Sequence, residues 1–187
     1  MHNPLPPRER MKIHRQHMPE QPPLERAHTF TEVNLGLDQA IAKQEALRCL
    51  SCKSQHCFTA CPVGVKVREF VDLIVAGDYL AAAAKIREDN VLPAVTGRVC
   101  PQEKQCEGAC VLSNRGEPVA IGYLERFVAD YERATGQVGI PPRAPATGRR
   151  VSLEAGRTDL WRGWVGFDGL CIGIDHFGAS APAPVLA

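Results

Sequence analysis

The pattern of apolar and polar positions predicts helices in the middle of the chain. In two successive stretches, which end at Gly77 and near Asn90, apolar side chains recur every three or four residues, as they do on the buried face of a helix. We expect these two helices to pack against each other as a hairpin. Their apolar positions are Val67, Phe70, Val71 and Ile74 in the first stretch and Tyr79, Ala82, Ala83 and Ile86 in the second.

Two further helices are predicted on either side of this hairpin. Asp38 is a suitable N-cap for a helix over roughly residues 39–48, which leads directly into Cys49. Pro118 is expected to begin a long helix that Gly136 ends, because proline suits the first turn of a helix and glycine suits its C-terminus.

The segment VLPAVTGRV, between the hairpin and the long helix, is expected to cross over as a loop. No part of residues 36–136 alternates strongly enough between apolar and polar positions to predict a strand. The predicted fold class is therefore mostly α, with one helical domain over residues 36–136.

The two ends of the chain lack this periodicity. Residues 1–35 are rich in Pro, Arg and His, and we expect them to form an extended arm. Residues 137–150, QVGIPPRAPATGRR, contain three prolines and two glycines and are predicted to be a linker. The expected anchors of the arm on the core are Phe30, Val33, Leu35 and Leu37.

Residues 151–187 have a different composition, with Gly-rich turns, two tryptophans and a short apolar run, VSLEA, that is suited to a strand. We predict a short, irregular tail of α/β character. A segment below about 40 residues usually needs outside support to fold, so the tail is expected to be part of something larger.

Charge and cysteine usage narrow the function. The formal net charge is +1, from 22 basic and 21 acidic residues, so we expect neither nucleic acid nor a membrane surface as partner. No apolar run is long enough for a membrane span, and the N-terminus lacks the apolar region of a signal peptide, so a cytoplasmic location is expected. Thiols stay reduced in the cytoplasm, so eight cysteines favour metal binding over disulfides.

Seven of the eight cysteines fall in two runs whose spacing is too regular for scattered core thiols, and only Cys171 lies outside them without an obvious role. The runs are Cys49-x2-Cys52-x4-Cys57-x3-Cys61-Pro62 and Cys100-Pro101-x4-Cys106-x3-Cys110.

Iron–sulfur clusters, zinc and plain thiols are the three interpretations of these runs. Zinc sites commonly use Cys-x2-Cys knuckles, and only Cys49 and Cys52 have that spacing. The other intervals, and the proline after Cys61, are typical of ferredoxin-like cluster binding. The spacing therefore favours iron–sulfur clusters.

Two cubane clusters need eight ligands. In two-cluster ferredoxins the fourth cysteine of a run binds the other cluster, which would put Cys49, Cys52 and Cys57 on one cluster and Cys61 with the second run. Cys110 would complete one site, and the other would need an oxygen or nitrogen ligand. The candidates for this last ligand are Glu103, Glu107, Glu117, Glu125 and His56.

The segments EALRCLSC, CFTACPVGV, PAVTGRVCP, CEGACVL and GEPVAIGYLERFVADY resemble the N-terminal iron–sulfur domain of the small (beta) subunit of NADPH-dependent glutamate synthase. The same domain opens dihydropyrimidine dehydrogenase and the large subunit of the NADH-dependent ferredoxin:NADP oxidoreductase. The resemblance covers residues 18–136 and implies an α-helical ferredoxin-like fold with two 4Fe–4S clusters. It implies Cys49, Cys52, Cys57 and Cys110 as ligands of one cluster and Cys61, Cys100, Cys106 and Glu125 as ligands of the other.

In this family an FAD domain and an NADPH domain follow, and electrons pass through the clusters to a partner subunit. The Gly-x-Gly-x-x-Gly fingerprint of such a domain is absent from GRRVSLEAGRTDLWRG, and the tail is too short to hold one. We therefore expect an electron-transfer module without activity of its own, with a glutamate synthase large subunit-like or other redox partner. Arg48 and Arg98 are candidates for offsetting the charge of a cluster.

The tail resembles part of the C-terminal domain of transketolase, on the residues VSLEAG, WVG and GIDHFGASAP. It carries none of the thiamine-diphosphate-binding parts, so no transketolase activity is expected. This resemblance predicts a chimeric chain with a truncated first part and a join near Thr147 to Val151. The alternative functions are a zinc-stabilised helical interaction module and a non-functional chimeric fragment.

Overall fold

The computed structural model describes residues 3–139, 166–167 and 170–171. The chain divides into two units, residues 1–140 and 141–187, and each is described by itself. In the second unit, β1 (Gly166–Phe167) pairs antiparallel with β2 (Leu170–Cys171). The expected strand VSLEA and residues 140–150 of the expected linker lie outside the described residues.

The first unit is helical, as the sequence predicts, and the structure confirms three of the predicted helix ends. The Asp38 carboxylate accepts a hydrogen bond from the Ile41 N–H at 2.8 Å and caps α3. Gly77 and Gly136 end α5 and α8 with φ of 85° and 68°, a conformation that glycine adopts without strain. The helices are α1 (Pro7–Arg10), α2 (Pro23–Arg26), α3 (Gln39–Leu47), α4 (His56–Thr59), α5 (Val67–Ala76), α6 (Tyr79–Arg87), α7 (Pro93–Val99) and α8 (Ile121–Thr135), with short 3₁₀ turns η1 (Gln102–Lys104) and η2 (Val111–Arg115).

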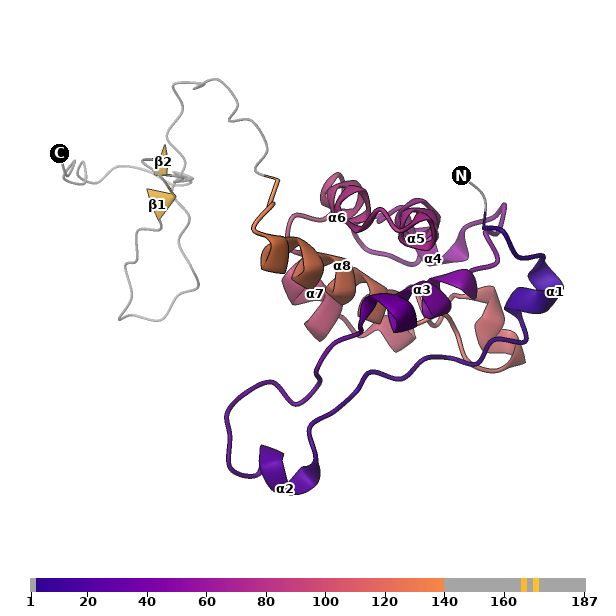
Figure 1. The fold of residues 1–187 in the computed structure, drawn as a ribbon. Helices are drawn as coiled ribbons and strands as arrows, with labels where there is room; N and C mark the ends of the chain where they lie inside the picture. The colour runs from indigo at the N-terminus through magenta and orange to yellow at the C-terminus, as the bar shows by residue number, and fades with distance from the viewer. Residues whose placement is uncertain (1–2, 140–165, 168–169, 172–187) are drawn as a thin grey trace. The chain divides into compact units, whose positions relative to one another are not determined.

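The core lies where the hairpin of α5 and α6 packs on α3 and α8 (Figure 1). Tyr79, at the start of α6, meets the rings of Phe127 and Tyr131 edge-on, with centroids 5.1 and 5.0 Å apart. Among the described helices, none is both long and apolar enough to cross a membrane. The largest fully buried apolar side chains are Phe70, Val71, Ile74, Ile86, Leu124 and Val128.

The segment VLPAVTGRV is not the expected loop, because residues 93–99 form α7. Pro93 occupies the first turn of this helix, where its missing N–H costs no hydrogen bond. A Cβ built on Gly97 would lie 2.7 Å from the backbone nitrogen of Arg126 in α8. Gly97 therefore allows the two helices to pack backbone to backbone.

The long helix starts at Ile121 rather than at the expected Pro118. The residues before it are held in a non-helical conformation, because the carbonyls of Glu117 and Pro118 accept hydrogen bonds from the buried Arg48 guanidinium at 2.6 and 2.8 Å. The N–H of Ala120 in turn donates to the Glu45 carboxylate at 2.8 Å. Side chains from α3 thus determine where α8 begins.

The N-terminal arm is mostly irregular, but its anchors differ from those expected. Leu37 is buried, whereas Phe30 is fully exposed and Leu35 is also exposed. Polar side chains fix the arm instead, among them Arg10 and Arg15. An isolated bridge between Glu20 and Asn34 closes the base of the segment around α2, which projects from the helices in Figure 1.

Candidate metal centres

Four cysteines line a single cavity in the helical unit. Cys49 and Cys52 follow the end of α3, Cys57 lies in α4, and Cys110 comes just before η2. The cavity is bounded largely by apolar side chains, with a few polar groups at its edge. Its other lining residues are Leu50, Ser54, Gln55, His56, Val67, Arg68, Ala109, Val111, Leu112, Val119 and Ile121.

These thiols are close enough to influence one another. Burial is the main cause that raises the pKa of the Cys49 thiol to about 12; a hydrogen bond from the Ser51 N–H opposes this rise, and the charges of Cys57, Asp72 and Cys110 contribute to it. Burial also raises the pKa of Cys52 and of Cys57, and Cys110 adds to both shifts. The same four side chains therefore line one largely apolar cavity and affect one another electrostatically.

A second group comprises Cys61 after α4, Cys100 at the end of α7 and Cys106 after η1, with Glu125 of α8. Burial is the main cause that raises the pKa of Cys100, and the Glu125 carboxylate and Cys61 add to it. The pKa of Cys106 is raised to about 12, mainly by burial and in smaller part by the charges of Glu107, Cys61 and Glu125. Among the described cysteines with a raised pKa, the thiols that contribute to each shift belong to the same group as the shifted cysteine.

Glu125 is the acidic member of this second group. Its side chain comes from α8 and is 8% exposed, and burial raises the pKa of its carboxyl against hydrogen bonds from Thr96 and Asn90. The Thr96 hydroxyl and the Asn90 amide donate to the same oxygen, Oε1, at 2.5 and 2.8 Å. The two hydrogen bonds orient the carboxylate through one oxygen, and neither of them engages Oε2.

The other four candidates for the eighth ligand have different surroundings. Glu107 is buried, but its Oε2 accepts from Arg15 at 2.7 Å and its Oε1 from the Gly122 N–H at 3.2 Å, so both oxygens are engaged. Glu103 and Glu117 are exposed. His56 lines the cavity of the first group, which already has four cysteines.

The donor set suits an iron–sulfur cluster in its chemistry. The seven described cysteines are free thiols, and they form one group of four and one group of three with a carboxylate. Among the described residues, no three His, Cys, Asp or Glu side chains are arranged as ligands of a single metal ion. A 4Fe–4S cluster takes its thiolates on different irons, so its ligands surround a space and do not converge on one point.

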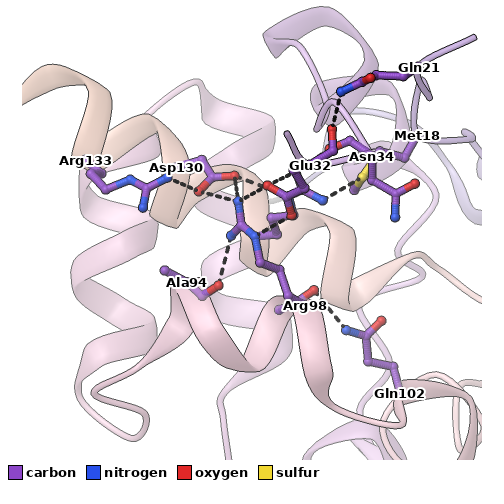
Figure 2. Close-up of polar contacts among 11 residues, drawn as sticks. Met18, Gln21, Glu32, Asn34, Ala94, Arg98, Gln102, Asp130 and Arg133 are labelled. Carbon is purple, nitrogen blue, oxygen red and sulfur yellow. Dashed lines mark hydrogen bonds and ion pairs between the residues drawn. The ribbon is translucent and has the colours of Figure 1, made fainter. Parts of the chain in front are cut away.

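Arg48 and Arg98, the two arginines suggested by the sequence, bond to carboxylates and backbone carbonyls. Arg48 is buried and pairs with Glu45 at 2.7 Å. Figure 2 shows Arg98 between Glu32 of the arm and Asp130 of α8, with N–O distances of 2.8 and 2.7 Å. Arg98 therefore fastens the arm to α7 and α8.

Sequence reasoning missed Arg10, whose guanidinium reaches the first cysteine group. Its Nη1 donates to the Cys49 carbonyl at 2.8 Å and to the Ser51 hydroxyl at 3.2 Å. No apolar period or motif marks this residue, because it lies 39 residues before Cys49 in an arm that looks solvated. Nothing in the local sequence therefore distinguishes Arg10 from the other arginines of the arm.

Comparison with known proteins identifies the helical unit. Residues 26–137 match the family described as dihydropyrimidine dehydrogenase domain II with a 4Fe–4S cluster. The chain belongs to this family. The fold expected from the resemblance is thus confirmed as a helical iron–sulfur domain.

Several curated proteins are similar to this chain over the same region. The NAD-dependent dihydropyrimidine dehydrogenase subunit PreT of Escherichia coli K12 is 36% identical over 129 residues, which are 69% of this chain and 31% of PreT. The small chain of NADPH glutamate synthase from the same strain is 34% identical over 135 residues, 72% of this chain and 29% of that protein. The putative oxidoreductase AegA is 38% identical over 108 residues, 57% of this chain and 16% of AegA. The chain thus spans less than a third of these relatives.

A second family matches the other end of the chain. Residues 140–187 match the transketolase-like C-terminal domain. This match begins before Thr147, where the sequence suggested that the join starts. The two families meet within the segment that was expected to be a linker.

Proposed function

We propose that this chain is an iron–sulfur electron-transfer module with two 4Fe–4S clusters. Cys49, Cys52, Cys57 and Cys110 would hold the first cluster, and Cys61, Cys100, Cys106 and Glu125 the second. Bound clusters of this kind supply one-electron transfer. The domain limits are those of the sequence analysis, with an arm over residues 1–35, a cluster domain over 36–136 and a linker before the tail.

The observation that supports this proposal most is the grouping of the ligand candidates. The seven cysteines of the two runs fall into a set of four and a set of three, and Glu125 from α8 joins the set of three. A group of four thiols in one apolar cavity and a group of three with an oriented carboxylate are the donor sets that two cubane clusters need.

The residues around the first group contribute burial and hydrogen bonds. Apolar side chains such as Val67, Leu112 and Ile121 keep water from the cavity. The backbone N–H of Ser51 donates to the Cys49 sulfur, and such bonds to cluster sulfurs raise the reduction potential. In the second group, Thr96 and Asn90 hold the Glu125 carboxylate in place, close enough to Cys100 to raise the pKa of that thiol.

The proposal is tested by purifying the full chain without oxygen and reconstituting it with iron and sulfide. Two clusters correspond to about eight irons and eight sulfides per chain, with broad visible absorption and an electron-paramagnetic-resonance signal after reduction. A matched variant, Cys171→Ser, should keep the full iron content, and Cys52→Ser should lose the first cluster. A colourless chain that binds zinc and no iron would support the interaction-module alternative and contradict the proposal.

The partner is proposed on chemical grounds. An electron-transfer module needs a donor and an acceptor, and the relatives are subunits of larger oxidoreductases. We propose a redox protein like the glutamate synthase large subunit as acceptor and a flavin domain using FAD and NADPH as donor. Neither nucleic acid nor a membrane is part of the proposal.

Free thiols at all seven described cysteines support a reducing, cytoplasmic location.

A further inference from the structure

Arg10 differs from the other buried arginines of the described chain. Arg48 pairs with Glu45 at 2.7 Å and Arg126 with Asp130 at 3.2 Å, so each has a carboxylate beside it. Arg10 is 7% exposed, and none of the ion pairs among the described residues includes it. A charge buried without a counter-charge is costly, so the negative charge that balances Arg10 has to come from something else.

The guanidinium of Arg10 is held by neutral oxygens only. Nε donates to the Leu5 carbonyl at 2.6 Å and Nη2 to the Asn3 carbonyl at 3.1 Å. Nη1 donates to the Cys49 carbonyl at 2.8 Å and to the Ser51 hydroxyl at 3.2 Å. Asn3 is buried as well, and its amide donates to the Leu47 carbonyl at the end of α3 at 3.0 Å.

The turn that Arg10 grips has an unusual backbone. Ser51 has φ of 51°, the only positive φ among the described residues other than glycine. This left-handed conformation is costly for a serine and persists where neighbouring contacts hold it. The bonds from Arg10 to the Cys49 carbonyl and the Ser51 hydroxyl hold two residues of the Cys49–Cys52 turn in this conformation.

We propose that Arg10 is the positioning residue of the first cysteine group and supplies the positive charge that balances the cluster which that group would hold. The inference rests on the proposed function, because four thiolates around a 4Fe–4S core leave the site with net negative charge. The arm thus contributes to the first cluster site through Arg10 and Asn3, in addition to packing against the helices.

The test compares three full-length variants after anaerobic reconstitution. Arg10→Met removes the charge and all four hydrogen bonds, Arg10→Lys keeps the charge with fewer donors, and Arg8→Met removes an exposed arginine of the same helix as a control. The signal that Cys52→Ser abolishes identifies the first cluster. Its midpoint potential is measured by redox titration, and its rate of loss to a ferrous chelator is measured beside it.

Arg10→Met is expected to lower the midpoint potential of the first cluster and to speed its loss several-fold, while the second cluster is unchanged. Arg10→Lys should keep the potential near that of the wild type and still lose iron faster. If Arg10→Met does not fold, Arg10→Lys decides, and a rate of loss equal to that of Arg8→Met overturns the inference.

Other outcomes separate this inference from the proposed function. A wild-type chain that takes up no iron overturns both. A wild-type chain with two clusters whose first potential is the same in Arg10→Met and Arg8→Met overturns the inference alone, and leaves the proposed clusters in place.

Discussion

Glu45 shows how one buried carboxylate can connect several parts of this domain. Glu45 is completely buried in α3, and its carboxylate accepts from Arg48 at 2.7 Å, from Ala120 N–H at 2.8 Å and from Gln16 N–H at 2.7 Å. One side chain therefore ties together the arm, α3 and the start of α8.

Replacing Glu45 by Ala is expected to destabilise the fold severely. The variant leaves the Arg48 charge buried without its partner and frees two backbone N–H groups, and breaking a buried pair typically costs about 3 to 5 kcal/mol. Denaturant unfolding under anaerobic conditions measures the loss. Gln44→Ala, at an exposed position of the same helix, is the control and should change the free energy of unfolding little. A loss as small as that of the control would mean that Arg48 finds another partner.

Glu125→Ala should remove the second cluster and spare the first. The variant takes away the only acidic member of the second group, and the three remaining cysteines would leave one iron without a protein ligand. Iron analysis should fall from about eight to about four per chain. Glu103→Ala, an exposed candidate, is the control and should keep all the iron. Full iron content in Glu125→Ala would point to another eighth ligand.

The ligand residues differ in how far the sequence could predict them. The spacing of the cysteines is a local property of the chain, so their grouping into sites could be proposed without a fold. Glu125 was one of five candidates, and only the family resemblance singled it out, because an acidic residue on a helix is usually solvated. Arg10 and Glu45 were missed, since the contacts that tie them to other parts of the chain reach residues 29 to 75 positions away, which only folding brings together.

At the scale of the elements, α7 carries Cys100 at its end and packs on α8 through Gly97. A side chain at Gly97 would have to push the two helices apart, since its Cβ would lie 2.7 Å from a backbone nitrogen. The position of this helix and the geometry of the second cysteine group are therefore linked.

Gly97→Ala is expected to destabilise the fold by about 1 to 3 kcal/mol, the usual cost of inserting a group into a packed contact. It should also weaken the second cluster selectively, because Cys100 follows α7 directly. Anaerobic denaturation and iron analysis measure both effects. Gly139→Ala, where an added Cβ meets nothing within 4 Å, is the control. Equal stability of the two variants would show that α7 and α8 can move apart freely.

Helices with a strong apolar period were predicted well, and elements that owe their form to a partner were not. The hairpin of α5 and α6 has a clear period and a glycine at its turn, so its boundaries followed from local rules. α7 contains a glycine and three β-branched residues and leaves Val95 and Val99 exposed, so its sequence looked like a loop. Its helical form depends on α8, which no local rule could include.

At the scale of the whole chain, both candidate sites and the core lie within residues 3–136, which were expected to form a helical domain with an arm. The change of composition after residue 136 suggested a join, and the matches to two unrelated families meet in the same region. The change is visible in the sequence without a fold, since both tryptophans of the chain lie after residue 150.

A chain ending at residue 140 is expected to keep both clusters and the stability of the full chain. Every described contact that builds the core and the two sites lies before that residue, including the Tyr131 ring against Tyr79 and the ion pair of Glu132 with Arg87. Iron content, the visible spectrum and the melting temperature of the two chains should agree. A chain that ends at Asp130 loses Tyr131 and Glu132 and should melt at a lower temperature. Loss of iron in the chain ending at residue 140 would show that the transketolase-like tail takes part in the iron–sulfur domain.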